Sequence, residues 1–211
     1  MLDLSDFAGQ VLTHGALVSM LAEYKAPNFK IHSLLRDQRL IGLKKGLYVV
    51  APAENGQLIS LPLVANHLYG PSYVSLEFAL FHYGLIPEHV ARVTSVCTKR
   101  GKRFATPLGL FSYQQLPVDY YALGVRYTRE SETLAYMMAT PEKALCDWLA
   151  LTPNLRMYSA RGLAVLLLED MRMDEDILAG LDRELIARIA ATGFRSQRLQ
   201  YLAACLEGLA C

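Results

Sequence analysis

The sequence lacks an excess of charge of either sign. Its 21 Lys and Arg residues nearly balance 20 Asp and Glu residues, which leaves a formal net charge of +1 over 211 residues. A field that draws the whole molecule to nucleic acid or to an acidic membrane is therefore excluded, and any polyanion site must be local. Hydrophobic residues make up 53% of the chain, which is enough for a full core and argues against disorder.

Long hydrophobic runs and closely spaced cysteines are also missing. The longest aliphatic run, GLAVLLL at 162–168, is far too short to span a bilayer. The opening MLDLSDFAGQ carries acids instead of a basic segment followed by an apolar one, so we expect no secretory signal and a cytoplasmic protein. No CxxC pair occurs, which predicts buried free thiols in a reducing compartment. The four cysteines are Cys97, Cys146, Cys205 and Cys211.

Motifs for catalysis and metal binding are absent from the sequence as well. It contains no HExxH, GxSxG or glycine-rich phosphate loop. The acidic stretch EDMRMDED at 169–176 lacks the ligand spacing and central glycine of a calcium loop. We therefore expect no enzyme, metal or cofactor. An enzyme that acts on RNA or nucleotides through the C-terminal part stays open as an alternative.

The first forty residues predict short helices. Leu2, Leu4, Phe7 and Val11 recur at roughly helical spacing, and a second apolar stripe runs through 16–24. Pro27 then interrupts the helical pattern, and Asn28 is expected to cap a third helix over about 29–38.

A basic hairpin is predicted next, in RLIGLKKGLYVV at 39–50. Two β-prone runs flank Lys44, Lys45 and Gly46, and glycine tolerates the positive φ that a tight turn requires. The stretch from Lys25 to Tyr48 contains six cationic residues and one acidic residue, which gives it a local charge of +5. Short helices followed by a strand pair are typical of a winged helix-turn-helix.

This charge pattern suits DNA. Outward cations on a recognition helix and a basic wing hold phosphates, while helix side chains read base edges. Arg36 suits guanine, Asn28 suits adenine or a phosphate, and the hairpin lysines suit the backbone. A protein-docking module with solvated cations is the alternative. The candidate DNA-binding residues are Asn28, Lys30, His32, Ser33, Arg36, Arg39, Lys44 and Lys45.

A linker and a larger second domain are predicted after the hairpin. APAENGQ at 51–57 contains Pro and Asn-Gly breakers, so we expect domains at 1–53 and 58–211. The second domain begins with helices, one of them capped by Ser75, and continues with β-prone segments at 91–98 and 108–116 and in GVRYT and TLAYMMA. From Thr140 the chain is expected to be helical, with Thr140 as cap and Pro141 in the first turn. The expected fold class is α+β.

A second basic cluster lies between the two β-prone segments, in KRGKRF at 99–104. A cationic hairpin tip there would bind nucleic acid or an acidic partner, and a solvated turn explains it equally well. The residues concerned are Arg92, Lys99, Arg100, Lys102 and Arg103.

Four stretches together resemble the AbiEi-type antitoxins of type IV toxin-antitoxin systems. They are GLKKGLYVV at 42–50, LPLVANHLYGPSYVSLEFALFHYGLIPE at 61–88, VTSVCTKRGKRFATPLGLFSY at 93–113 and ATPEKALCDWL at 139–149. The resemblance implies an N-terminal winged helix-turn-helix and a C-terminal antitoxin domain.

The resemblance also implies a function. The protein would repress its own operon at promoter repeats in double-stranded DNA, and it would oppose a nucleotidyltransferase-like toxin without a stable complex. The DNA-contact role would fall to the exposed helix and wing residues named above. The second basic cluster, including Arg92, would form the antitoxic surface.

Overall fold

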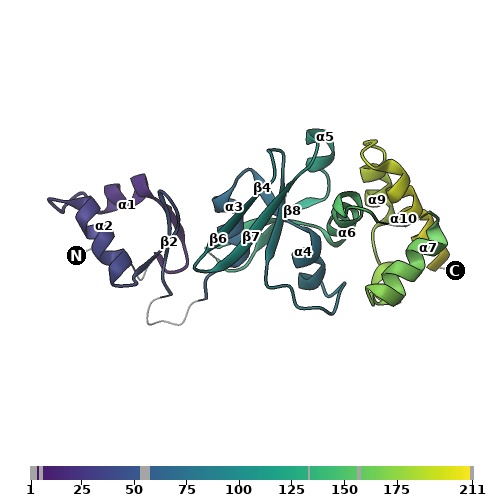
Figure 1. Ribbon diagram of the computed structural model, residues 1–211, viewed down its shortest axis with the longest axis horizontal. Coiled ribbons are helices and arrows are strands. Elements are labelled where there is room, and N and C mark those ends of the chain that lie inside the picture. The colour runs from purple at the N-terminus through teal and green to yellow at the C-terminus, as the bar shows by residue number, and fades with distance from the viewer. Residues whose placement is uncertain (1–3, 5–6, 53–57, 133, 156–157, 210–211) are drawn as a thin grey trace.

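The computed structural model describes residues 4, 7–52, 58–132, 134–155 and 158–209 of the chain. The protein is mixed α+β and contains two sheets. A small N-terminal unit lies at one end, a six-stranded sheet lies in the middle, and a group of helices forms the other end (Figure 1). Within the described part of the chain, no helix combines the length and the apolar character that crossing a membrane requires.

The N-terminal unit combines two helices with a three-stranded antiparallel sheet. Its strand order is β1-β3-β2, with β3 in the centre. The elements are β1 (Val11–Thr13), α1 (His14–Met20), α2 (Pro27–Arg36), β2 (Leu40–Lys44) and β3 (Leu47–Val50). The predicted hairpin is confirmed, because β2 and β3 pair around the turn at Lys45 and Gly46, where Gly46 has a φ of +78°.

The prediction of a first helix through Val11 is wrong. Val11 lies in β1 and pairs with Val49, because β3 offers a strand edge that a short apolar stretch can join. Residues 1–3 and 5–6 of the predicted helix lie outside the described residues.

The prediction for Asn28 is also wrong. The helix α2 already begins at Pro27, whose fixed φ suits a first helical position, so Asn28 lies within the first turn and does not cap it.

The larger sheet has the order β6-β7-β5-β4-β9-β8. The strand pairs β4/β5, β6/β7 and β8/β9 are antiparallel, whereas β4/β9 and β5/β7 are parallel. The strands are β4 (Ser72–Val74), β5 (Val93–Cys97), β6 (Lys102–Thr106), β7 (Gly109–Gln115), β8 (Val125–Arg129) and β9 (Ala135–Ala139). The four predicted β segments are thus confirmed.

The basic segment between two of these strands is not a hairpin tip. Its second half begins the edge strand β6, and the chain reverses afterwards at Pro107 and Leu108. The reason is the parallel pairing of β5 with β7, since parallel neighbours cannot be joined by a tight turn. The intervening residues therefore form a strand of their own.

Helices lie on both faces of the large sheet and at the C-terminal end. Near the sheet are α3 (Leu61–Leu68), α4 (Leu76–His82), α5 (Val118–Tyr121) and α6 (Pro141–Leu151). The C-terminal group contains α7 (Ala160–Val165), the π-helical turn η2 (Leu166–Asp170), α8 (Glu175–Ala179), α9 (Arg183–Ala190) and α10 (Ser196–Leu209). The prediction for α6 is confirmed, because the Thr140 side chain accepts from the Lys143 N–H and Pro141 occupies the first turn.

Two buried clusters form the core. A small one lies within the N-terminal unit, between its helices and the strand residues Leu40 and Val50. The large one runs through the six-stranded sheet and the C-terminal helices, and it also takes in Leu43 and Leu47 from the small sheet. Three cysteines, at positions 97, 146 and 205, are buried and unpaired as predicted, and Cys211 lies outside the described residues. The predicted domain boundary likewise falls at 53–57, outside them.

Candidate functional site

The outer face of α2 carries polar and cationic side chains. Ile31 and Leu34 are buried against the small core, so the helical period turns the opposite face to solvent. The exposed residues on that face are Asn28, Phe29, His32 and Arg36. Lys30, at the edge of the face, holds its ammonium 5.5 Å from the centre of the Tyr24 ring.

Phe29 is a residue that sequence reasoning missed. Its exposed fraction is 81%, although an aromatic side chain is normally buried. The signal was present in the sequence, because Phe29 lies two positions before the buried Ile31 and seven before Arg36. It therefore falls on the outward side of the helix. The candidate surface is consequently less polar than the cations alone indicate.

Arg36 is partly engaged by its own neighbours. Its Nε donates to the Asp37 carboxylate at 3.2 Å, and the Ser33 hydroxyl donates to the same carboxylate at 3.0 Å. These hydrogen bonds, first from Ser33 and then from Arg36, lower the pKa of Asp37. The single acid of this region thus lies at the end of the predicted recognition face and offsets part of its charge.

The two hairpin lysines have different surroundings. The Lys44 ammonium donates to the Leu68 carbonyl oxygen at 2.5 Å and lies 5.9 Å from the centre of the Phe104 ring. Desolvation lowers its pKa, helped by the nearby charges of Lys102 and Lys99. Lys45 is exposed and has no hydrogen bond or ion pair with any described residue. Lys44 therefore links the hairpin to the large sheet, and Lys45 is available to a partner.

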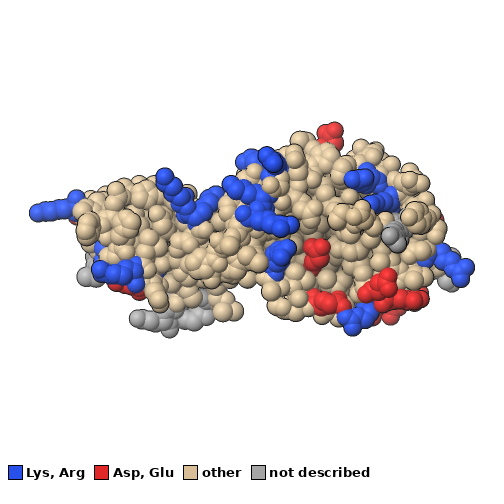
Figure 2. Space-filling view, viewed as in Figure 1, with Lys and Arg blue, Asp and Glu red and all other residues tan. Residues whose placement is uncertain are grey.

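Two residues of the second basic cluster gather with Lys44 around aromatic rings. Lys99 donates to the Gly70 carbonyl oxygen at 2.7 Å and lies 5.6 Å from the Tyr69 ring centre. Lys102 lies 5.7 Å from the Tyr69 ring and 5.0 Å from the Phe104 ring. Figure 2 shows the Lys and Arg side chains gathered over the middle of the molecule, near the six-stranded sheet.

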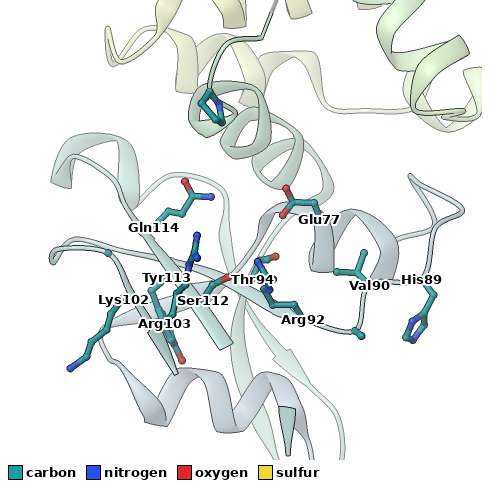
Figure 3. A pocket seen from close by; sticks show the side chains of 13 residues that line it. Glu77, His89, Val90, Arg92, Thr94, Lys102, Arg103, Ser112, Tyr113 and Gln114 are labelled. Carbon is teal, nitrogen blue, oxygen red and sulfur yellow. The ribbon is translucent and has the colours of Figure 1, made fainter. Parts of the chain in front are cut away.

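The remaining cations of this cluster lie elsewhere. Strand β6 alternates, so Arg103 points to the opposite face from Lys102, where it pairs in register with Ser112. Arg92, just before β5, lies on the same face as Arg103 (Figure 3). Arg100 is exposed in the loop before β6. The structure therefore divides the predicted antitoxic surface between two faces of the sheet.

A buried polar network, which sequence reasoning missed, joins α6 to β4 and α4. The Lys143 ammonium lies 3.1 Å from the Asp147 carboxylate, and both side chains are fully buried. Tyr73 and Ser75 donate their hydroxyls to the same carboxylate at 3.0 and 2.6 Å. Lys143 also donates to the Tyr120 carbonyl oxygen at 2.7 Å. The (i, i+4) spacing of Lys143 and Asp147 was the signal in the sequence.

Burial and ion pairing have opposite effects on the pKa values of Lys143 and Asp147. Desolvation raises the pKa of Asp147 and lowers the pKa of Lys143, while their mutual attraction and the two hydroxyl donors favour the ionised pair. Ser75 had been predicted to cap α4. It occupies the cap position, but its hydroxyl is directed to Asp147 instead of the helix N–H groups. The Lys143 and Asp147 side chains are sealed from solvent, so the network joins α6 to β4 and α4 inside the core.

Metal ligands are not gathered at any point of the described chain, where no cluster of three or more His, Cys, Asp or Glu residues is suitably placed for an ion. No known protein family matches this chain, and no curated protein matches it.

Proposed function

We propose that this chain is a cytoplasmic DNA-binding autorepressor and antitoxin of a type IV toxin-antitoxin system, with a winged helix-turn-helix at its N-terminus. The observation that carries the proposal is the exposed face of α2, which bears Asn28, His32 and Arg36 and packs beside the basic hairpin β2–β3. The four sequence stretches that resemble AbiEi-type antitoxins support the antitoxin half.

In this proposal α2 is the recognition helix and the β2–β3 hairpin is the wing. Arg36 and Asn28 read base edges in the major groove, where guanidinium and amide groups match guanine and adenine. Lys45 in the hairpin turn and Arg39 just after the helix are exposed and hold phosphates. Lys44 instead fixes the wing to α3 through the Leu68 carbonyl oxygen.

The test is binding of the full chain to its own upstream DNA across a salt series. The wild type is expected to prefer that DNA over a scrambled duplex, and Arg36→Ala is expected to lose about 1–3 kcal/mol of discrimination. Lys45→Ala should reduce the slope of log affinity against log salt by about one, because one phosphate contact is lost. Lys44→Ala, the matched control at the neighbouring position in β2, should leave the slope unchanged.

A different outcome would favour a second candidate function, docking of a protein partner on the same face. Phe29 lies on this face with an exposed fraction of 81%. It supports the alternative, since aromatic residues are enriched in protein interfaces. The DNA-binding proposal would be excluded if the chain bound any DNA equally and weakly, and if Arg36→Ala and Lys45→Ala did not change the affinity. The docking role would then remain.

The antitoxin half needs its own test, because it is independent of DNA binding. We propose that the partner is a nucleotidyltransferase-like toxin and that no stable complex is required. Co-expression with a toxin gene adjacent to this one should restore growth, and Arg36→Ala should still restore it. Absence of rescue by the wild-type chain would contradict this half alone.

A further inference from the structure

An open cavity of about 900 Å³ lies on one face of the large sheet, at its β6–β7 end (Figure 3). Its floor is formed by β5, β7 and β6, and its wall by Glu77 of α4 and by Pro153 after α6. On the opposite face Tyr113 donates to the Ala65 carbonyl oxygen of α3. The cavity lies beside the first turn of α4 and just beyond the C-terminal end of α6.

The floor of this cavity is cationic. Neighbouring strands place Thr94, Ser112 and Arg103 side by side in register, and Arg92 precedes β5 on the same face. The guanidinium groups of Arg92 and Arg103 form no hydrogen bond or ion pair with any described residue. Figure 3 shows their side chains lying together at the centre of the cavity, while Lys102 points away from it. Two unpaired guanidinium groups beside a hydroxyl suit a phosphate, which accepts from both.

The upper wall of the cavity has the opposite polarity. Glu77 and Gln114 lie above the arginines in Figure 3, and Glu77 too has no hydrogen bond or ion pair with the described residues. A carboxylate accepts hydrogen bonds from amino groups and repels phosphates. The cavity therefore distinguishes two ends of a ligand, one anionic and one that donates hydrogen bonds.

We propose that this cavity binds a nucleoside polyphosphate, with the phosphates on Arg92 and Arg103 and the base toward Glu77 and Gln114. The volume lies within the range of small-molecule sites, about 300–1,000 Å³. A nucleic acid strand fits less well, because its continuous backbone would bring phosphates against Glu77. This site is separate from the α2 face and does not depend on DNA binding.

The test is calorimetric titration of the full chain with ATP, with inorganic tripolyphosphate and with a single-stranded oligonucleotide. The expected order is ATP first, tripolyphosphate second and the oligonucleotide last. Arg92→Ala/Arg103→Ala should weaken ATP binding by about 100-fold or more, given two charge-assisted contacts. The matched control Arg129→Ala/Arg161→Ala removes two exposed arginines outside the cavity and should change the affinity less than about threefold.

A third variant tests whether Glu77 contacts the base of the ligand. Glu77→Gln should bring the affinities for ATP and tripolyphosphate closer together, because it removes both the acceptor charge and the repulsion of phosphate. The proposal is overturned if the two double variants lose ATP binding equally, if the oligonucleotide binds most tightly, or if the wild type does not bind ATP at millimolar concentration. Loss of discrimination between DNA sequences in Arg36→Ala, with ATP binding intact, would separate this site from the proposed repressor function.

Discussion

The N-terminal unit and the six-stranded sheet place their charged residues in opposite ways. The buried side chains of the N-terminal unit are aliphatic, and its lysines and arginines point outward from α2 and the hairpin. The larger unit instead encloses Lys143 and Asp147 at its centre, with both side chains fully buried. The difference teaches that a charge count by segment does not distinguish a binding surface from a structural ion pair.

The energetic consequences of the two arrangements also differ. An exposed charge interacts through water and contributes little to stability, so it is free to serve a partner. A buried pair has lost its hydration, and removal of one member leaves the other uncompensated. Substitution within the buried Lys143–Asp147 pair should therefore affect stability, whereas substitution of the exposed cations of the N-terminal unit should affect binding.

The largest effect is expected from Asp147→Ala. It leaves the Lys143 ammonium buried without its counter-charge and the Tyr73 and Ser75 hydroxyls without their acceptor. We expect a loss of about 3–5 kcal/mol in the free energy of unfolding, measured by urea denaturation. Asp119→Ala, which removes an exposed acid, should change stability by less than about 0.5 kcal/mol. Equal effects of both substitutions would remove the contrast between the two regions.

A double substitution tests whether the unpaired Lys143 ammonium causes the loss of stability in Asp147→Ala. Lys143→Met/Asp147→Leu replaces both charges with apolar groups of similar size, so no unpaired charge remains. It should cost less than Asp147→Ala alone. A double variant less stable than the single one would mean that the ion pair itself, and not the orphaned ammonium, carries the stabilisation.

An intermediate effect is expected from Gly124→Ala. Gly124 has a φ of +67°, and a Cβ there would lie 2.8 Å from the Cβ of Lys143. We expect a loss of about 1–3 kcal/mol from backbone strain and the close approach, seen as a lower Tm. The control Gly208→Ala lies in α10 with open space around the added methyl group, and should be neutral or stabilising by up to about 1 kcal/mol. Equal Tm values would contradict the tight contact.

The smallest effect is expected from Asp37→Asn in the N-terminal unit. The pKa of Asp37 is lowered in the folded chain, so its contribution is complete above the ordinary value of 3.8 and is lost as pH falls through the lowered one. The wild type should be slightly more stable than the variant at pH 7, and the difference should vanish in strong acid. Urea midpoints at several pH values measure this. A difference that grows toward low pH would have the wrong sign.

Local patterns in the sequence predicted much of the fold. The β-prone segments of the middle region, the cap at Thr140 with Pro141, and the hairpin around Gly46 all depend on residues close together in the chain. Such features follow from backbone preferences that act over a few residues. The errors arose where distant segments compete, as at Val11, which joins β3 because a strand edge is available there.

The candidate surfaces show the same division. The sequence by itself determined which residues of α2 face outward and that the hairpin turn is basic, because helical and turn geometry is local. Only the tertiary structure decided that Lys44 contacts Leu68, that the basic segment joins the sheet as an edge strand, and that Tyr73 donates to the buried Asp147. These outcomes depend on which segments meet in space, and burial then fixes whether a charge is paired inside or presented to a ligand.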